Sequence, residues 1–180
     1  MKIYNTPFPN LRQPSVVALG TFDGVHIGHA AVITAAVEKA KKLGIRAVIW
    51  CFTHPPKSDS VITTPEEKAS LIAALGADAL IMMPPTTPEL LSLTPEDFAD
   101  ALIASLCPLH IVVGYNYTYG KGAAGTPDTL RAYLAPRGVG LSVIPPVEHN
   151  GVPVSSTAIR RLLAQGDAAP ASALLGRQIK

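Results

Sequence analysis

The chain has 180 residues, a formal net charge of +2, 48% hydrophobic residues and 16% charged residues. This length and composition favour one soluble globular domain with a proper core, and they exclude a disordered chain. The weak charge, without a Lys/Arg cluster beyond the end of one predicted helix, gives no basis for nucleic-acid binding.

The two cysteines, Cys51 and Cys107, lie far apart and have no partner at metal-ligand spacing, so we expect two reduced thiols. The first seven residues hold no apolar signal segment. No apolar run approaches the roughly 18 residues of a membrane helix. We therefore expect a cytoplasmic protein without membrane contact, and the sequence does not indicate its oligomeric state.

Apolar runs and helical patterns alternate along the chain. The apolar runs predict five strands, over residues 16–19, 47–52, 79–83, 109–113 and 141–144. Helices are expected over residues 30–43, 64–75, 94–105, 126–134 and 155–164, with a last short helix ending near Leu175. Crossovers of this length imply an α/β fold, with a five-stranded parallel sheet and helices on both faces.

Ligands of such sheets bind at the carboxyl ends of the strands, so the loops after the strands are the candidate site. Three of these loops begin with a proline pair, at residues 55–56, 84–85 and 145–146. For residues 84–85, a stiff loop start is the simpler interpretation. The long loops over residues 57–63 and 115–125 are either functional or flexible.

The stretch from Gly20 to His29, GTFDGVHIGH, follows the first predicted strand and precedes the first predicted helix. A strand that ends at glycines and continues as a helix presents backbone N–H groups to an anion. We therefore expect a polyphosphate site with His26 and His29 at its mouth, where Gly28 lets a ligand approach closely. Helix capping or packing by the histidines is the alternative. The stretch matches neither a Walker A loop nor a dinucleotide fingerprint.

A second stretch, VSSTAIRR over residues 154–161, opens a predicted helix with hydroxyl side chains. Ser or Thr caps helices in any protein, so the hydroxyls alone decide nothing. Arg160 in the first turn is unfavourable against the helix dipole unless an anion lies there too. Together these residues suit the outer phosphates of a nucleotide, whereas Arg161 fits a solvent position equally well.

GTFDGVHIGH and VSSTAIR resemble the two signatures of the HxGH nucleotidyltransferase superfamily. With CFTHPP, TTPEEKASLIAALGAD, SLTPEDF, VVGYNYTYGKGAAG and ALLGR in order, nearly the whole chain resembles the FMN adenylyltransferase (FAD synthetase) module of bacterial bifunctional riboflavin kinase/FMN adenylyltransferases. The resemblance implies a Rossmann-like nucleotidyltransferase fold. It also implies a single FMN adenylyltransferase domain over residues 1–180, without a riboflavin kinase domain, that converts ATP and FMN into FAD and pyrophosphate with Mg²⁺.

The resemblance also implies roles for individual residues. The implied catalytic residues are His26, His29, Asn116 and Arg160, and Asn116 is also the implied metal ligand. The implied ATP-binding residues are Gly20, Thr21, Phe22, Asp23, Gly28, Ser156 and Thr157. The implied flavin-binding residues are Phe52, Pro55, Pro56 and Tyr117.

Asp23 is a second metal candidate, although an Asp in such a turn often bonds its own backbone. Tyr115, Tyr117 and Tyr119 suit either stacking on a flavin ring or an ordinary exposed strand end.

Two segments depart from the family's usual pattern. The usual Phe-x-Pro-His-Pro is Phe-Thr-His-Pro-Pro over residues 52–56, and Thr118 stands where the family carries Arg. Both departures lie on the presumed flavin side. Two alternatives therefore stay open: transfer of an adenylyl or cytidylyl group to another phosphorylated acceptor, or a non-catalytic flavin- or nucleotide-binding protein.

The implied chemistry needs no strong general base, because a phosphate monoester is already an anionic nucleophile. It needs in-line positioning and neutralisation of charge on the phosphates. Imidazoles can donate hydrogen bonds to phosphoryl oxygens, and we expect a nearby polyphosphate to favour their charged form.

Overall fold

A six-stranded parallel sheet forms the centre of the molecule, in the strand order β1-β4-β3-β2-β5-β6. The computed structural model describes residues 1–56 and 60–179, so part of the loop expected over 57–63 lies outside the described residues. The strands are β1 (Lys2–Tyr4), β2 (Ser15–Leu19), β3 (Arg46–Phe52), β4 (Ala79–Met83), β5 (Pro108–Gly114) and β6 (Gly140–Ile144).

The expectation of five strands is wrong by one edge strand. β1 pairs with β4 through three residues, from Lys2 opposite Ala79 to Tyr4 opposite Ile81. Its side chains are exposed or half-buried. A three-residue edge strand has no alternating or continuous apolar pattern, so its sequence gives too little signal. The other five strands are confirmed to within one residue at either end.

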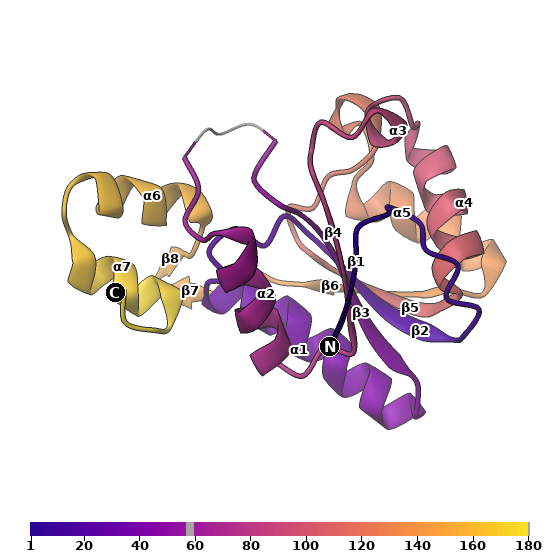
Figure 1. Cartoon of the computed structure of the whole chain (residues 1–180), viewed down its shortest axis with the longest axis horizontal. Coiled ribbons are helices and arrows are strands. Elements are labelled where there is room, and N and C mark those ends of the chain that lie inside the picture. The colour runs from indigo at the N-terminus through magenta and orange to yellow at the C-terminus, as the bar shows by residue number, and fades with distance from the viewer. Residues whose placement is uncertain (57–59, 180) are drawn as a thin grey trace.

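Helices cover both faces of the sheet (Figure 1). They are α1 (Ile27–Leu43), α2 (Pro65–Ala74), α3 (Pro88–Leu91), α4 (Pro95–Leu106), α5 (Pro127–Leu134), α6 (Ser156–Ala164) and α7 (Ala168–Leu175), with the 3₁₀ turns η1 (Lys121–Ala123) and η2 (Ala135–Arg137). The Thr-Pro starts are confirmed: Thr64 forms a capping box with Glu67, and Thr94 accepts a hydrogen bond from the backbone of Asp97. The short α3 was not expected.

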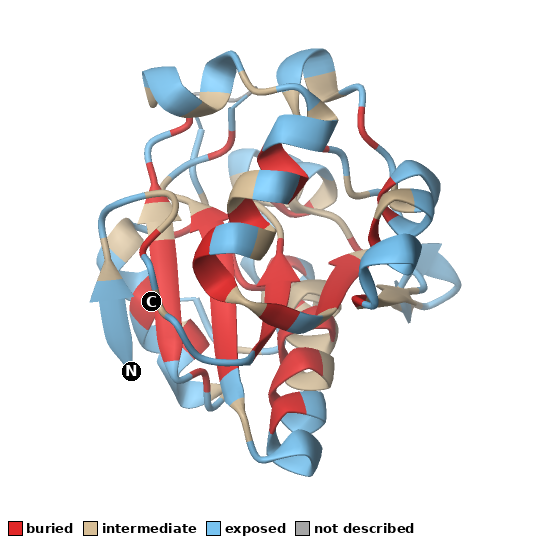
Figure 2. Ribbon diagram, turned by 90° about the vertical axis from the view of Figure 1, so that its right-hand side faces the viewer, coloured by how far each residue is buried: buried red, intermediate tan, exposed pale blue. Residues whose placement is uncertain are grey.

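Two cores lie on opposite faces of the sheet, as the alternation of side chains along a strand requires. On β2, Val16 and Ala18 pack with α1 and α2, whereas Val17 and Leu19 pack with α4 and α5. All five β2 residues are buried. Figure 2 shows the buried residues gathered on the strands and on the helix faces turned toward them. The central strands are therefore rigid supports for the loops at their carboxyl ends.

The C-terminal elements form a small group beside the start of α1 (Figure 1). It comprises the hairpin β7 (Glu148–His149) and β8 (Val152–Pro153), followed by α6 and α7. A third core of Val154, Ile159 and Leu175 holds this group together. Ile27 at the start of α1 and Ile62 pack against that core. Residues at opposite ends of the sequence therefore meet where α1 begins.

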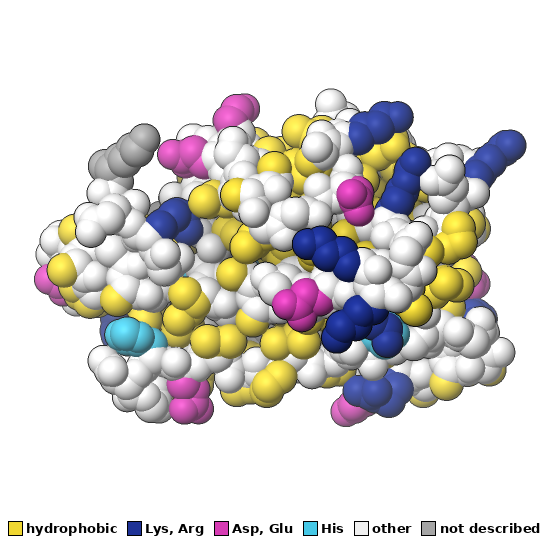
Figure 3. All heavy atoms as spheres, turned by 90° about the horizontal axis from the view of Figure 1, so that it is seen from below, with side chains coloured by type: hydrophobic (Ala, Val, Ile, Leu, Met, Phe, Trp, Pro, Cys, Tyr) yellow, Lys and Arg dark blue, Asp and Glu magenta, His cyan; other side chains and the backbone are white. Residues whose placement is uncertain are grey.

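The surface seen in Figure 3 carries acidic and basic side chains interspersed with apolar ones. Among the described residues, no helix combines the length and apolar character needed to cross a bilayer. Cys51 and Cys107 are both free thiols, as expected.

Candidate functional site

The candidate site lies where the chain reverses its direction across the sheet. From β2 the chain builds outward to β3 and β4, and it then returns to add β5 and β6 on the other side of β2. In open α/β sheets the crevice at this reversal is the usual ligand site. The segment from residue 20 to 26, which we call the glycine loop, leaves β2 at this point and leads into α1.

The glycine loop has an unusual backbone. Phe22 has φ 51° and Val25 has φ 40°, a region that side-chain-bearing residues rarely occupy, and Gly24 has φ 83°. The ring of Phe22 is 1% exposed in the core below the loop. The N–H of Gly24 donates to Thr63 Oγ1 at 3.1 Å. Strain of this kind persists only where surrounding contacts hold the segment in place.

The two histidines are stacked at the start of α1. Their ring centroids are 3.6 Å apart with an interplanar angle of 19°, and the ring of Phe22 meets His29 edge-on at 5.4 Å. His26 is the N-cap of α1, and its Nδ1 accepts the N–H of His29 at 3.3 Å. In the neutral ring, this bond leaves the proton on Nε2. Capping, the alternative interpretation, is therefore true of His26, and it fixes the orientation of its ring.

Burial keeps both imidazoles neutral at pH 7 in the ligand-free chain. It lowers the pKa of His26 to about 4, although the negative charge of Asp23 acts in the opposite direction. Burial also lowers the pKa of His29, helped by the neighbouring His26 and Lys68. The expectation of charged rings concerns the polyphosphate-bound state. Burial by itself favours two neutral rings.

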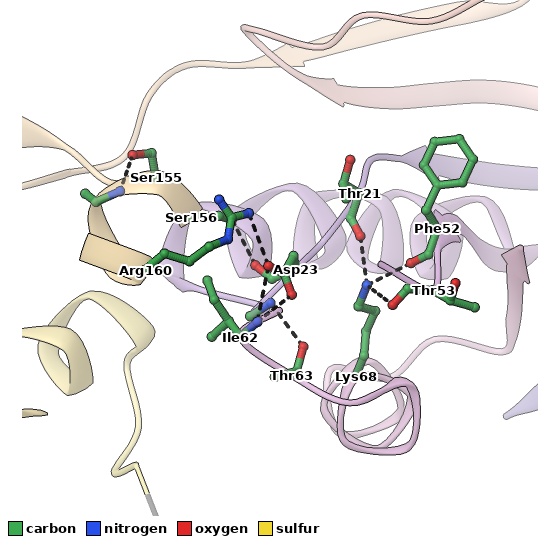
Figure 4. A network of polar contacts seen from close by, with 12 residues as sticks. Thr21, Asp23, Phe52, Thr53, Ile62, Thr63, Lys68, Ser155, Ser156 and Arg160 are labelled. Atoms are coloured by element: carbon green, nitrogen blue, oxygen red, sulfur yellow. Dashed lines mark hydrogen bonds and ion pairs between the residues drawn. The ribbon is translucent and has the colours of Figure 1, made fainter. Parts of the chain in front are cut away.

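Arg160 is paired with a buried carboxylate. Asp23 is 1% exposed, and its side chain accepts from Arg160 Nη2 at 3.2 Å and from the N–H of Ile62 at 3.1 Å. Figure 4 shows this pair reaching from α6 to the glycine loop. The anion that the position of Arg160 required is therefore Asp23. Asp23 bonds a distant segment rather than its own turn, and its engagement makes it a poor metal ligand.

The start of α6 is attached to the glycine loop by a second contact. The Ser156 hydroxyl donates to the backbone carbonyl of Asp23 at 2.9 Å. Ser155 is the N-cap of α6 and accepts from the N–H of Ala158 at 3.2 Å. Thr157 is exposed toward the pocket described next. The two stretches that the sequence predicts as phosphate sites, residues 20–29 and 154–161, are thus brought together by hydrogen bonds. Ser156 and Asp23 are 133 residues apart in the chain.

One pocket of about 850 Å³ is lined by every residue predicted for the site. Its lining includes Gly20, His26, His29 and Arg160 together with Phe52. Among the described residues, neither His29 Nδ1 nor Arg160 Nε has a hydrogen-bond partner, although both atoms are buried. Unpartnered buried polar atoms are uncommon in native proteins, and here they mark where a polar ligand would complete the site.

Gly28 lines the same pocket at the second position of α1. A Cβ atom at this position would lie 3.2 Å from the ring of His26. The glycine therefore makes room for the histidine ring as well as for a ligand.

The three tyrosines after β5 are not equivalent. Tyr119 is buried between Phe98, at 5.8 Å, and the parallel ring of Tyr117, at 5.7 Å. Its ring therefore belongs to the core, although it also borders the pocket. Tyr117 is half-buried and Tyr115 is exposed. The interpretation as an exposed strand end holds for Tyr115 but is wrong for Tyr119, because the loop folds back through the Tyr119–Gly125 bridge.

Lys68 is the residue of this region that the motif analysis missed. It is fully buried in α2, and its ammonium group reaches the backbone carbonyls of Thr21, Phe52 and Thr53 (Figure 4). The sequence did carry a signal. Lys68 and Ile72 are four residues apart and therefore share a face of the helix, so a cation lies on an apolar face.

The fold is a Rossmann-like α/β fold, and the candidate site lies at the switch point of its sheet. The family model for FAD synthetase matches residues 9–158. The chain belongs to the FAD synthetase family.

Three proteins are similar to this chain over most of its length. A bifunctional riboflavin kinase/FMN adenylyltransferase of Listeria monocytogenes is 34% identical over 89% of this chain and 53% of its own length. An FAD synthetase of the same organism is 32% identical over 91% of this chain and 69% of its own length. A crystal structure described as a macrolide-efflux protein from Streptococcus pneumoniae superposes with a TM-score of 0.87 at 27% identity, covering 98% of this chain and 60% of that one. The chain spans about half the length of the bifunctional relative.

Proposed function

We propose that this chain transfers AMP from ATP to FMN, giving FAD and pyrophosphate. The observation that carries the proposal is one pocket with two kinds of wall. The glycine loop and the start of α6 supply histidines, hydroxyls and a guanidinium, while the loops after β3 and β5 supply aromatic and proline side chains. Membership of the FAD synthetase family supports the same assignment.

The polar wall suits the phosphates of ATP. In the proposal His26 and His29 donate hydrogen bonds to phosphoryl oxygens, and the hydroxyls of Ser156 and Thr157 hold the outer phosphates. Arg160 exchanges its contact with Asp23 for one with a phosphate, which its unpartnered Nε is free to join. In the proposal the nucleotide approaches the backbone of Gly20, Thr21, Phe22 and Gly28 closely. These residues line the pocket together with Asp23.

The apolar wall suits the flat ring system of a flavin. Phe52 is half-buried at the end of β3, where it meets Trp50 edge-on at 5.2 Å. Pro55, Pro56 and Tyr117 also line the pocket. Apolar and aromatic surfaces of this kind bury a planar ring with little loss of side-chain freedom.

Asn116 is the proposed protein ligand of Mg²⁺. Its exposed side chain lines the pocket, and an amide oxygen is a suitable magnesium ligand. Among the described residues, no three His, Cys, Asp or Glu side chains cluster as a metal cage. This donor set fits an ion held by one protein oxygen together with phosphates and water. When bound, the ion would neutralise charge on the phosphates.

In the proposed step a phosphate oxygen of FMN attacks the α-phosphorus of ATP. The new P–O bond forms as the bond between the α-phosphorus and the α,β-bridging oxygen breaks, and that oxygen leaves with pyrophosphate. The chain's residues hold the two reactants in line and stabilise charge on the α-phosphate and the leaving group. None of the pocket residues needs to remove a proton from the nucleophile.

The proposal is tested by incubating the chain with ATP, FMN and Mg²⁺ and separating the flavins by chromatography. FAD formation is the expected result. Pyrophosphate release only with CTP or with another phosphorylated acceptor would replace the assignment with the first alternative, and binding without turnover would replace it with the second. We further propose that residues 1–180 form a single adenylyltransferase domain, so riboflavin and ATP should give no FMN.

A further inference from the structure

Lys68 occupies a position that is unfavourable for a cation. It is the fourth residue of α2, near the positive end of the helix dipole, and its side chain is 0% exposed. Its neighbours on the helix, Ala69 and Ile72, belong to the core under α1. A buried charge is costly unless hydrogen bonds compensate it. Its contacts must therefore account for its presence.

The Lys68 ammonium group is fully used by backbone carbonyls. Its Nζ donates to the carbonyl of Thr21 at 3.1 Å, of Phe52 at 2.7 Å and of Thr53 at 3.2 Å. An ammonium has three N–H donors, so each has an acceptor. Figure 4 shows the side chain rising from α2 to these three groups.

The three carbonyls belong to two different loops of the pocket. Thr21 lies in the glycine loop after β2, whereas Phe52 and Thr53 end β3 and begin the segment leading to Pro55 and Pro56. The last backbone hydrogen bond between the segments that follow β2 and β3 runs from the N–H of Gly20 to the carbonyl of Trp50, at 3.2 Å. Beyond that bond, Lys68 bridges the gap between them. Lys68 itself is not one of the described residues that line the pocket.

We propose that Lys68 is a positioning residue that sets the separation of the nucleotide and acceptor walls of the pocket while touching neither substrate. The inference rests on the proposed function, since it assigns one substrate to each wall. Misplacement of reacting groups by about 1 Å can cost roughly 100-fold in rate. A residue that holds both walls is therefore expected to affect both substrates at once.

The test compares Lys68→Met, which keeps the length of the side chain without its donors, with Ile72→Val as control. Ile72 lies in the same helix, is 0% exposed and packs in the core under α1. It is not among the described residues that line the pocket. Lys68→Met should raise the hydrogen-exchange rates of the backbone amides of residues 20–24 and 52–54 by about tenfold relative to Ile72→Val. Equal exchange in the two variants, or a change spread evenly over α2 and the core, would overturn the proposal.

Calorimetry provides the second readout, with a non-hydrolysable ATP analogue and FMN titrated separately. Lys68→Met should weaken both ligands, and kcat/KM should fall by roughly 100-fold. Ile72→Val should leave both affinities within about twofold. Loss of one ligand only would overturn the proposal. If Lys68→Met does not fold, Lys68→Arg takes its place, because it keeps the charge but replaces the compact ammonium with a larger planar guanidinium. That group cannot donate to the same three carbonyls without displacing them, so wild-type affinities for both ligands would then count against the proposal.

Failure of the proposed function gives a different result. If wild-type protein binds no FMN, that function fails, while the hydrogen-exchange comparison still decides the role of Lys68.

Discussion

At the scale of single residues, the stacked histidines carry most of the proposed chemistry. His26 is fixed by its cap bond to the N–H of His29, and His29 is held between His26 and Phe22. A buried Nδ1 without a partner among the described residues leaves His29 free to bond a ligand. The geometry thus combines a structural role for one ring with an open binding role for the other.

His29→Ala should lower turnover by roughly 100- to 1000-fold, because it removes a donor to a phosphoryl oxygen. Urea unfolding should show that the variant still folds cooperatively. His149→Ala is the matched control, since His149 lies in the hairpin strand β7 and outside the pocket lining. Near-normal turnover of the His29 variant would remove this residue from the mechanism.

The pKa of His26 predicts the acid stability of the chain. Its ordinary value of 6.5 falls to about 4 in the folded state. Between these two pH values the unfolded chain binds more protons, so the free energy of unfolding should decrease as the pH falls from 6.5 toward 4. The contribution of His26 is roughly 3 kcal/mol at most.

Urea titrations at several pH values from 7.5 to 4 measure this effect. His26→Gln should flatten the pH dependence, although His29 leaves a part of it. An unchanged profile in His26→Gln would contradict the burial argument.

At the scale of elements, the sequence predicts most of what local chemistry determines. Five strands follow from apolar runs, and the helix starts at Thr64 and Thr94 follow from the cap residues, because these signals lie within one segment. α1 begins at Ile27, three residues before the expected start, because His26 acts as its N-cap. The two phosphate-type stretches were identified from their motifs alone.

The contacts between distant segments could not be predicted. The pairing of Asp23 with Arg160 joins residues 137 apart in the chain, and no periodicity in either segment indicates it. The same holds for Lys68 and the carbonyl of Thr21, 47 residues apart. The burial of Tyr119 was not expected, because it depends on contact with Phe98 of α4. Such features depend on how the elements pack, which a single sequence does not show.

The docking of α7 on α1 can be tested with two glycines. Gly176 has φ 69°, and a Cβ atom there would lie 2.7 Å from Ile27 Cγ2. Gly166 has φ 79° with nothing within 4 Å of such an atom. Gly166→Ala should therefore cost only the backbone strain, about 1–2 kcal/mol. Gly176→Ala adds overpacking of about 1–3 kcal/mol, and equal losses in chemical denaturation would show that α7 does not press on α1.

At the scale of the whole molecule, the sheet brings two parts of the sequence into one site. β2 delivers the glycine loop, and the C-terminal group places the start of α6 against it through Ser156 and Arg160. The loops after β3 and β5 deliver the aromatic side chains of the proposed acceptor wall. The central claim is that these walls align the α-phosphate of ATP with the phosphate of FMN.

The most direct test follows the label from radioactive ATP in the presence of FMN and Mg²⁺. With ATP labelled at the α-phosphate, the label should appear in FAD, and with ATP labelled at the γ-phosphate, it should appear in pyrophosphate. Label from the γ-position in the flavin product, or no label from the α-position in it, would contradict adenylyl transfer at this site.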